Sequence, residues 1–416
     1  MNKKLAIRFA VGIGLIAVLV VAFQWFRSLQ GDFDFGKADT ADWVVAVQRL
    51  DEGSQVIVIK PDGAIVAAPD HRAGSSDQEP VWRPDGNRVF FSSNRAGGAY
   101  EIFRWNPQSG KVEKRSSGSR SKGSLWCGPK GDPQANVDFL ITAGGFVVQY
   151  DPKTGSGRQV LPPTTEERAM DEEGGSSGQF DSMYRDLGKS FQEAQWGPGR
   201  RWIVAKMVRE NGDEILVYQG VEPEMTDKGL QIAPPAPIAA GNKIDFDVAP
   251  SGEVVVSIQG FRWPTEVPAE FIKDGKATTP YLNGLIVINP ETPGGPKTLN
   301  LFITKERQVL ASPRLSPDGK SVAVVAGTVD EQEQFVPASL VVLPVEERGI
   351  DRARPLSQGT IYEPSWHPSG TKLVFAKRDS EGKRSLYAIP SDGGTEQNLT
   401  GGKGDFANPS FSPQTK

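Results

Sequence analysis

The sequence predicts an all-β fold: a seven-bladed β-propeller of four-stranded antiparallel blades, preceded by one N-terminal transmembrane helix. Three observations predict it. A strand-and-turn unit recurs along the chain, 46 Gly and 32 Pro occur among the 416 residues, and one long apolar run lies near the N-terminus. So many turn-forming residues favour short strands over long helices. A propeller of this length routinely forms one domain, so the length does not force a split.

The first expected element is an apolar run from Phe9 to Phe26, which basic residues precede and Arg27 closes. About 18 residues at about 1.5 Å each span roughly 27 Å, close to the hydrocarbon thickness of a bilayer. The anchor residues are Phe9, Leu15, Leu19, Phe23, Trp25 and Phe26. Because basic residues stay inside, we expect a single-pass protein of the cytoplasmic (inner) membrane, with its propeller in the periplasm or an equivalent extracytoplasmic space.

A cleaved signal peptide is the competing interpretation, because Val20 and Ala22 are small residues at the spacing that a signal peptidase accepts. Large aromatic residues continue past that point, which suits an anchor better. We therefore expect an anchor or uncleaved signal over residues 1–27, a polar tether over 28–41 and the propeller over 42–416.

The repeat is clearest in two copies. Glu-Pro-Val-Trp-Arg-Pro-Asp-Gly begins at Glu79, and Glu-Pro-Ser-Trp-His-Pro-Ser-Gly begins at Glu363. Each copy reads as a short strand ending in an aromatic residue, a tight turn, an apolar strand, a polar loop, another apolar strand and a Gly turn. This pattern predicts a four-stranded meander buried on both faces by its neighbours, which explains why strands such as Val89–Phe91 are apolar without alternation.

Seven first strands can be counted, and the ring they predict is closed by both ends of the chain. The copies lie at Glu79, Ser124, Glu193, Lys243, Ser312, Glu363 and Asn408. The last copy stops after one strand, while the region behind the tether begins in the middle of a repeat, at Trp43–Val47. We expect the C-terminal strand to join the N-terminal blade, which leaves no exposed sheet edge in the ring.

These repeats resemble the TolB-like, WD-type β-propeller repeat family. The resemblance rests on the motif Pro-x-Trp-x-Pro-Asp-Gly followed by a strand containing Phe, and the copies together cover nearly all of residues 42–416. The motif is strong at Glu79, Ser312 and Glu363 and degenerate in the other copies. TolB itself is six-bladed with a separate α/β domain, and we expect neither that domain nor a C-terminal hydrolase domain here. A role in envelope maintenance would follow by fold analogy alone.

The connections between strands divide between two faces of the ring. The turns after the first and third strands share one face, here called the turn face; the other two connections share the opposite face, the loop face. Three of the longest insertions, Thr164–Gln192, Gly260–Asn283 and Thr328–Ala338, map to the loop face, as does the basic loop Lys111–Lys122. Because binding activity on such scaffolds is carried by loops, we expect the loop face to be the interaction surface.

Candidate partner-binding residues follow from these insertions. They are the acidic Glu166, Glu167, Glu172 and Glu173, the aromatic Phe261, Trp263, Phe271 and Tyr281, and the basic Arg115 and Arg120. The aromatic residues could anchor a partner. The alternatives are a solvated acidic loop and an aromatic loop packed back on its own blade.

No catalytic or cofactor-binding constellation is predicted. Nucleophile elbows, Walker loops and dinucleotide fingerprints are missing, and with one cysteine and two histidines the chain cannot build a Cys-rich or His-rich metal site. Asp245 and Asp247 alternate on a predicted innermost strand, so both could hold a cation in the axial channel, the alternative being ordinary blade-turn hydrogen bonds. His367 is expected to cap a blade turn, and Trp82, Trp126, Trp196 and Trp366 to fill one repeated core position.

Two hypotheses for function remain. The net charge of −4 lacks the basic excess that nucleic-acid binding needs, so we expect no nucleic-acid partner. The first hypothesis is a non-catalytic scaffold, anchored in membrane lipid, that binds another envelope or membrane protein, for example as an accessory subunit of a complex. The second is a propeller enzyme, resembling a hydrolase or lactonase, or a small-ligand or cation binder, acting in the axial channel. The oligomeric state stays open.

Overall fold

The structure, a computed structural model, describes residues 39–128, 139–151, 154–162, 190–221, 224–226, 229–231, 236–261, 272–273, 276–277, 282–291, 297–304, 307–332, 334–345 and 352–413. The chain divides into two compact units, residues 1–39 and 40–416. The predicted anchor and all six of its named residues lie outside the described part. Within that part, no helix has both the length and the apolar character needed to cross a bilayer.

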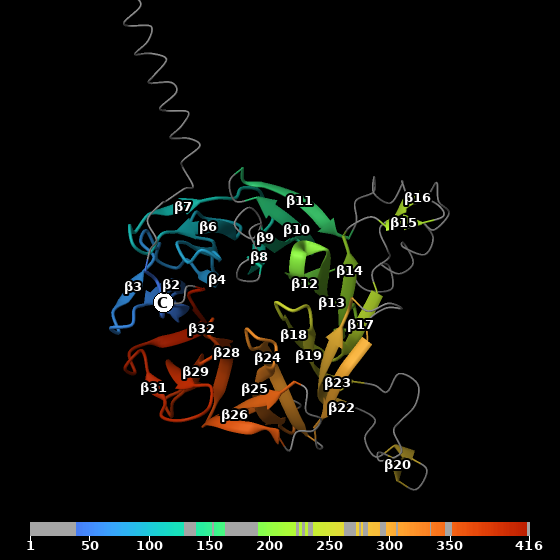
Figure 1. Ribbon diagram of the computed structural model, residues 1–416. Helices are drawn as coiled ribbons and strands as arrows, with labels where there is room; N and C mark the ends of the chain where they lie inside the picture. The colour runs from blue at the N-terminus through green and yellow to red at the C-terminus, as the bar shows by residue number, and fades with distance from the viewer. Residues whose placement is uncertain are drawn as a thin grey trace, which may run out of the picture. The chain divides into compact units, whose positions relative to one another are not determined.

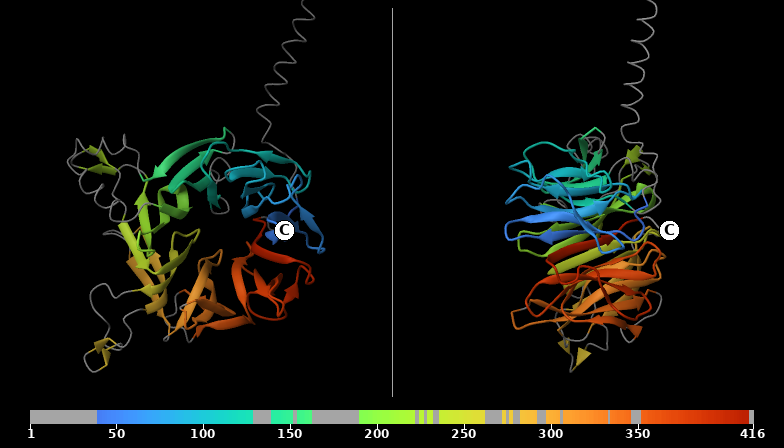
Figure 2. Two further views of the ribbon diagram at one scale, coloured as in Figure 1. Left: turned by 180° about the vertical axis from the view of Figure 1, so that it is seen from behind. Right: turned by 90° about the vertical axis from the view of Figure 1, so that its left-hand side faces the viewer.

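The second unit contains seven four-stranded antiparallel sheets set around a ring (Figures 1 and 2), which confirms the predicted blade number. From the centre outward, blade 1 is β32 (Asp405–Phe411), β1 (Val44–Arg49), β2 (Ser54–Ile59) and β3 (Ile65–Ala67); blade 2 is β4 (Asp77–Trp82), β5 (Val89–Ser93), β6 (Glu101–Trp105) and β7 (Val112–Lys114); blade 3 is β8 (Lys122–Trp126), β9 (Phe139–Ala143), β10 (Phe146–Asp151) and β11 (Ser156–Leu161).

The remaining blades follow in chain order. Blade 4 is β12 (Ser190–Trp196), β13 (Trp202–Val208), β14 (Glu214–Gly220) and β17 (Ala236–Gly241); blade 5 is β18 (Lys243–Val248), β19 (Val254–Phe261), β22 (Leu282–Asn289) and β23 (Lys297–Ile303); blade 6 is β24 (Gln308–Leu315), β25 (Ser321–Val329), β26 (Phe335–Pro344) and β27 (Arg354–Gln358); blade 7 is β28 (Ile361–Trp366), β29 (Lys372–Arg378), β30 (Arg384–Pro390) and β31 (Gln397–Asn398).

Three small elements lie outside the blades. A 3-10 helix, η2 (Pro198–Arg200), follows β12, and the hairpin β20 (Ile272–Lys273) with β21 (Lys276–Ala277) lies in the predicted loop-face insertion of blade 5. The hairpin β15 (Glu224–Thr226) with β16 (Gly229–Gln231) connects the third and fourth strands of blade 4. By topology this last hairpin belongs to the turn face, where the sequence had not predicted an insertion.

The ring is closed by the two ends of the unit, as predicted. β32 pairs antiparallel with β1, from Val44 opposite Phe411 to Arg49 opposite Asp405. The pairing continues beyond the strands, because the Ser412 amide donates to the Trp43 carbonyl over 2.8 Å. The closing blade therefore draws its innermost strand from the C-terminus and its other three from the N-terminus.

The segment Thr40–Trp43, here called the clasp, reinforces this closure by contacting the blades on both sides. Thr40 Oγ1 donates to the Gly86 carbonyl of blade 2 over 3.0 Å and lies 2.9 Å from Ser412 Oγ. Asp42 accepts a hydrogen bond from the Lys372 ammonium of blade 7. One short segment thus holds blades 7, 1 and 2 together.

The core is divided into layers between neighbouring blades. In β1, Val45 and Val47 pack with Phe91 and other residues of blade 2, whereas Val44 and Ala46 pack with side chains of blade 7. Both faces of a central strand are therefore buried, which accounts for its continuous apolar sequence. Burying one such side chain contributes about 1.5–3 kcal/mol, so each blade depends on both neighbours.

The prediction of one tryptophan position per blade needs one correction. Trp82 pairs with Val89, and Trp82 Nε1 donates to the Ser410 carbonyl of blade 1. In blade 3, Trp126 pairs with Leu140 just after a bulge, which is the register of Val81 rather than Trp82. Cys127 therefore takes the core position in that blade, where burial raises the pKa of its thiol to about 12.

Replacing Phe406, a fully buried residue of the closing strand β32, tests how much stability the closure provides. We expect Phe406→Ala to lower the free energy of unfolding by about 3–5 kcal/mol, because the cavity opens at the layer between blades 7 and 1. Chemical denaturation measures the change. Val336→Ala, at an exposed position, is the control and should cost under about 0.5 kcal/mol; equal effects of the two variants would contradict closure by a packed β32.

Candidate functional site

The innermost strands of the seven blades share one repeated position. We call it the inner ring; its members are Glu79, Ser124, Glu193, Asp245, Ser312, Glu363 and Asn408. Five of these residues have φ between 47° and 54°, in the left-handed region: Glu79, Ser124, Ser312, Glu363 and Asn408. At the same five places the pairing of first and second strands shifts register. Each is a β-bulge, and a bulged residue loses its partner in the ladder.

Carboxylates of the inner ring supply the missing partners from the neighbouring blade. Asp245 Oδ2 accepts the Ser312 amide over 3.2 Å, and Glu363 Oε2 accepts the Asn408 amide over 2.6 Å. Glu79 Oε2 accepts the Ser124 amide in the same way. An acidic side chain on one blade thus caps the bulge of the next, and three of the four inner-ring carboxylates are used for assembly.

The fourth carboxylate, Glu193, lies 3.5 Å from the Lys206 ammonium of its own blade. It also acts at a distance on Glu79. Burial raises the pKa of Glu79, the hydrogen bond from Ser124 opposes this, and the charge of Glu193 raises it further. Negative charges of the inner ring therefore affect one another.

Asp245 and Asp247, predicted as a weak cation site, both bond to blade 6. Asp245 caps the bulge at Ser312, and Asp247 Oδ2 accepts the Leu315 amide over 2.9 Å. Burial raises the pKa of Asp247 to about 6, although the charge of Arg314 and the amide hydrogen bond lower it. Among the described residues, no three His, Cys, Asp or Glu side chains gather as metal ligands would.

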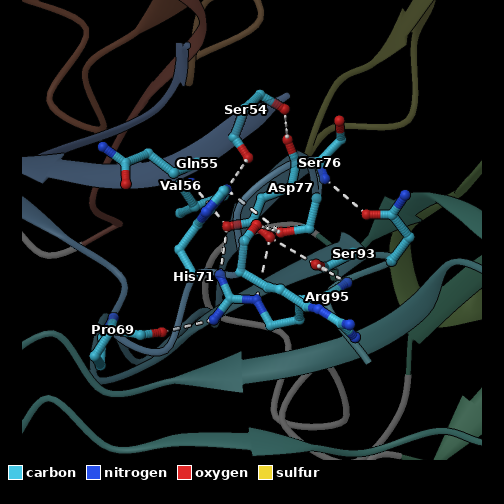
Figure 3. Close-up of polar contacts among 12 residues, drawn as sticks. Ser54, Gln55, Val56, Pro69, His71, Ser76, Asp77, Ser93 and Arg95 are labelled. Carbon is cyan, nitrogen blue, oxygen red and sulfur yellow. Dashed lines mark hydrogen bonds and ion pairs between the residues drawn. The ribbon is translucent and has the colours of Figure 1, made fainter. Parts of the chain in front are cut away.

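A buried polar cluster at the loop-face ends of the strands of blades 1 and 2 was not predicted from the sequence. Asp77 at the start of β4 accepts hydrogen bonds from Ser93 Oγ over 2.6 Å, from the Val56 amide over 3.1 Å and from the Arg95 guanidinium (Figure 3). Arg95 also donates to the Pro69 carbonyl over 2.7 Å. Asp77 and Arg95 are buried and both belong to blade 2, and their hydrogen bonds with Val56 and Pro69 join this ion pair to blade 1.

Two similar ion pairs join other blades near the same face. Lys122 Nζ of blade 3 lies 3.0 Å from Glu101 Oε2 of blade 2, and Arg384 Nε of blade 7 lies 3.2 Å from Asp405 Oδ1 of blade 1. His71 belongs to the first cluster, with Nε2 2.9 Å from the Ser54 carbonyl oxygen. That nitrogen must donate, so it cannot take a proton from the nearby Ser75 hydroxyl as a catalytic base would.

His367 confirms its predicted role as a turn cap. Its Nδ1 accepts the Ser369 amide over 3.1 Å and lies 2.6 Å from Ser369 Oγ, while Nε2 lies 3.1 Å from Asp42 Oδ1. The row Asp42, His367, Ser369 has the order of a catalytic triad. However, the equivalent side chains of blade 6, Ser316 and Asp318, make the same contact over 2.6 Å. The contact belongs to the repeated turn.

The predicted loop Thr328–Ala338 is mostly strand. β25 continues to Val329 and β26 begins at Phe335, so the two form a hairpin longer than the blade requires. Asp330 Oδ1 orders its tip by accepting the Gln332 and Gln334 amides over 2.9 and 2.8 Å. Val336 on this hairpin is 45% exposed, more than any other large apolar side chain in the described part of the chain.

The other predicted loop-face residues are only partly described. Within Lys111–Lys122, residues Val112–Lys114 form β7, Arg115 is half-buried and exposed Arg120 lies 5.0 Å from the Phe146 ring. The strand β7, in which this basic loop begins, and the β25–β26 hairpin lie on different sides of the ring (Figure 1). Phe261 ends β19, but its side chain is outside the description. Trp263, Phe271, Tyr281, Glu166, Glu167, Glu172 and Glu173 also lie outside the described residues.

Comparison of the chain with known proteins gives few similarities in sequence and clearer ones in fold. No family model matches the chain. A curated relative, the protein TolB homolog of Chlorobium luteolum, is 29% identical over 114 residues, which are 27% of this chain and only 23% of the relative's length.

Two solved structures have similar folds. The puromycin-hydrolyzing peptidase of Mycobacterium tuberculosis has a TM-score of 0.54 at 12% identity, over 86% of this chain and 52% of that one. TolB from Acinetobacter baumannii has a TM-score of 0.48 at 16% identity, over 94% of this chain and 71% of that one. At 12% identity the likeness to the peptidase concerns the fold alone.

The Asp77–Arg95 pair generates a stability prediction. Asp77→Ala should lower the free energy of unfolding by about 3–5 kcal/mol, because it leaves Arg95 buried without its partner. The double variant Asp77→Ala, Arg95→Met is the control and should regain much of that loss. Denaturant titration of the wild type and of these variants gives the coupling. A double variant as unstable as the sum of the single changes would contradict a direct pairing.

The raised pKa of Asp247 generates a pH prediction. The folded protein holds a proton on this carboxyl more readily than the unfolded chain does, so its contribution to stability falls as pH rises from about 4 to about 6. Asp247→Asn cannot titrate and should gain about 1–3 kcal/mol relative to wild type over that interval. Chemical denaturation of the wild type and of Asp247→Asn at pH 4 and pH 7 measures this gain. A difference in unfolding free energy between the two proteins that is the same at both pH values would contradict the raised pKa of Asp247.

Proposed function

Because the chain is a TolB-like seven-bladed β-propeller, we propose that it is a non-catalytic scaffold that binds another protein through its loop face. We further propose that residues 1–27 anchor it in the cytoplasmic membrane, with the N-terminus inside and the propeller in the periplasm. The partner is then an envelope or membrane protein, and the chain can serve as an accessory subunit of a membrane complex.

The β25–β26 hairpin is the observation that carries this proposal. It extends a rigid blade, its tip is ordered by Asp330, and it presents the exposed Val336 on the loop face. An apolar side chain held out on a rigid element suits recognition of another protein. The insertions of blades 3 and 5 share this face by topology, and their acidic and aromatic residues extend the proposed surface.

The polar groups beneath this surface favour binding over catalysis. Asp77 with Arg95 and Glu101 with Lys122 are bound to each other, and the inner-ring carboxylates Asp245 and Glu363 are bound to backbone amides. A catalytic acid or base needs a proton to exchange with substrate. These groups instead fix the blades against one another, as a binding platform requires.

The position of the clasp supports the choice of face. Thr40 bonds to the Gly86 carbonyl in the turn after the first strand of blade 2, so the chain joins the ring at the turn face. The loop face lies on the opposite side of the ring from the turn where Thr40 makes this bond. An anchored protein built in this way can offer its loop face to a partner.

A pull-down from detergent-solubilised membranes tests the proposal with the full-length protein. Replacing residues 262–281 in blade 5 by a Gly-Ser linker of equal length should abolish recovery of a stoichiometric partner. The matched control replaces residues 222–235, the turn-face connection of blade 4, and should keep the partner. Both variants should keep the unfolding temperature of the wild type.

The results that would overturn the proposal are equally specific. Loss of the partner in both variants, or retention in both, would show that the loop face does not carry the contact. A wild-type protein that co-purifies with no stoichiometric partner would contradict the scaffold itself. Recovery of the chain in a soluble fraction would contradict the anchor.

The second candidate is a small-ligand binder or hydrolase acting in the axial channel, which Glu193 favours, because this inner-ring carboxylate caps no bulge in the described part of the chain. The purified protein would then bind a divalent ion, or turn over esters, lactones or peptides. Glu193 is the residue to replace, because its partner Lys206 is on its own blade and the assembly contacts between blades remain. Glu193→Gln should lower such binding or turnover while leaving the ring folded.

A further inference from the structure

A cavity of about 500 Å³ lies between blades 6 and 7 on the turn face, away from the proposed partner surface. Its volume is within the range of about 300–1,000 Å³ typical of small-molecule sites. Most of its lining comes from three tight turns, at Ser316–Asp318, Pro368–Thr371 and Ser391–Asp392. Such walls are held by the repeated turn hydrogen bonds and need no rearrangement to receive a ligand.

The cavity combines one aromatic face with acceptors, donors and hydroxyl groups. Trp366 contributes the indole, fixed because its Nε1 donates to the Arg314 carbonyl over 2.8 Å. Asp318 contributes an ionised carboxylate, since the hydrogen bonds from Ser316 and the Lys320 amide hold its pKa below the usual range. Both of those bonds end on Oδ1, which leaves Oδ2 for a ligand.

Further polar groups complete the lining. Arg354 Nη2 donates to the Ser391 carbonyl over 2.5 Å, which fixes the guanidinium at the wall, and Asp392 follows in the same turn. Ser369 Oγ lies 2.7 Å from Thr371 Oγ1 and 2.6 Å from His367 Nδ1. The hydroxyls therefore form an ordered row.

This set of groups discriminates between classes of ligand. An amine only donates hydrogen bonds and offers no acceptor to the Arg354 guanidinium. A phosphate or carboxylate only accepts hydrogen bonds, and the negative charges of Asp318 and Asp392 repel it. A neutral polyol both donates to the carboxylates and accepts from the guanidinium. A sugar ring in addition has an apolar C–H face that can lie against an indole.

The corresponding cavity between blades 7 and 1 has different chemistry, so the features above are not a general result of the repeat. That cavity, of about 390 Å³, is lined by Lys60, Lys372 and Phe411. Lys372 occupies the register of Ser321, and Asp42 of the clasp bonds to it. The hydroxyl-rich wall and the indole belong to the cavity between blades 6 and 7.

We propose that this cavity binds a neutral monosaccharide or disaccharide unit, with the sugar ring on Trp366 and its hydroxyl groups on Asp318, Asp392 and Arg354. Peptides are usually held along a free strand edge or in an apolar groove, neither of which three turns provide. The inference concerns the turn face and does not depend on the partner proposed for the loop face.

Titration of the full-length protein with glucose, galactose, N-acetylglucosamine and maltose tests this inference, by calorimetry and saturation-transfer NMR. At least one sugar should bind with a Kd of about 1 mM or tighter. Asp392→Ala should weaken that binding about 10-fold, because a charge-assisted hydrogen bond is lost. The matched control is Asp62→Ala, at the equivalent turn of the cavity between blades 7 and 1, and should leave the Kd unchanged.

Thermal unfolding establishes that both variants fold, and Arg354→Gln replaces Asp392→Ala if the latter does not. The inference is overturned if none of the four sugars binds at about 10 mM. It is also overturned if Asp392→Ala and Asp62→Ala weaken binding equally, or if choline or a neutral tetrapeptide displaces the bound sugar while binding more tightly.

Discussion

The bulged amide on the innermost strand of five of the seven blades is the constraint on which the ring depends. A left-handed residue at Glu79, Ser124, Ser312, Glu363 or Asn408 takes its N–H group out of its own sheet. An unpaired buried amide is costly, so an acceptor has to come from elsewhere. For Ser124, Ser312 and Asn408, carboxylates on adjacent first strands provide it, and in doing so they join blades that apolar layers also connect.

Charged side chains also connect blades at the loop-face ends of the strands. Glu101 with Lys122 and Arg384 with Asp405 each cross a boundary between two blades, and the Asp77–Arg95 pair of blade 2 bonds to the Val56 amide and the Pro69 carbonyl of blade 1. Apolar layers supply most of the burial energy but are tolerant of small shifts in position. Directional contacts at the boundaries fix the angle between blades, which keeps the loop face in one arrangement.

Much of the fold could be predicted from the sequence because it rests on local signals. The Pro-x-Trp-x-Pro-Asp-Gly motif contains both a strand end and its turn, and counting its copies predicted seven blades and the closure by Asn408. The site was harder to predict. Asp77 and Arg95 are 18 residues apart with no motif of their own, and only the closed ring brings Glu363 to the amide of Asn408.

Two further differences separate the predicted structure from the observed one. Trp126 was expected at the position of Trp82, yet the bulge at Ser124 and the additional residue before its turn place Cys127 there. Thr328–Ala338 was expected as one of the longest insertions on the loop face, and most of it is strand. The pairing of its two ends, with Thr328 opposite Val336 and Val329 opposite Phe335, is visible only in three dimensions.

The clasp has a mechanical consequence. A pull on the chain before Thr40 acts along β1, which lies between β32 and β2, so it loads both ladders in shear instead of opening their hydrogen bonds one at a time. Asp42 and Thr40 pass part of that load to Lys372 in blade 7 and to Gly86 in blade 2 before β1 itself is strained. The ring is thereby built to resist tension at the point where its polypeptide leaves it.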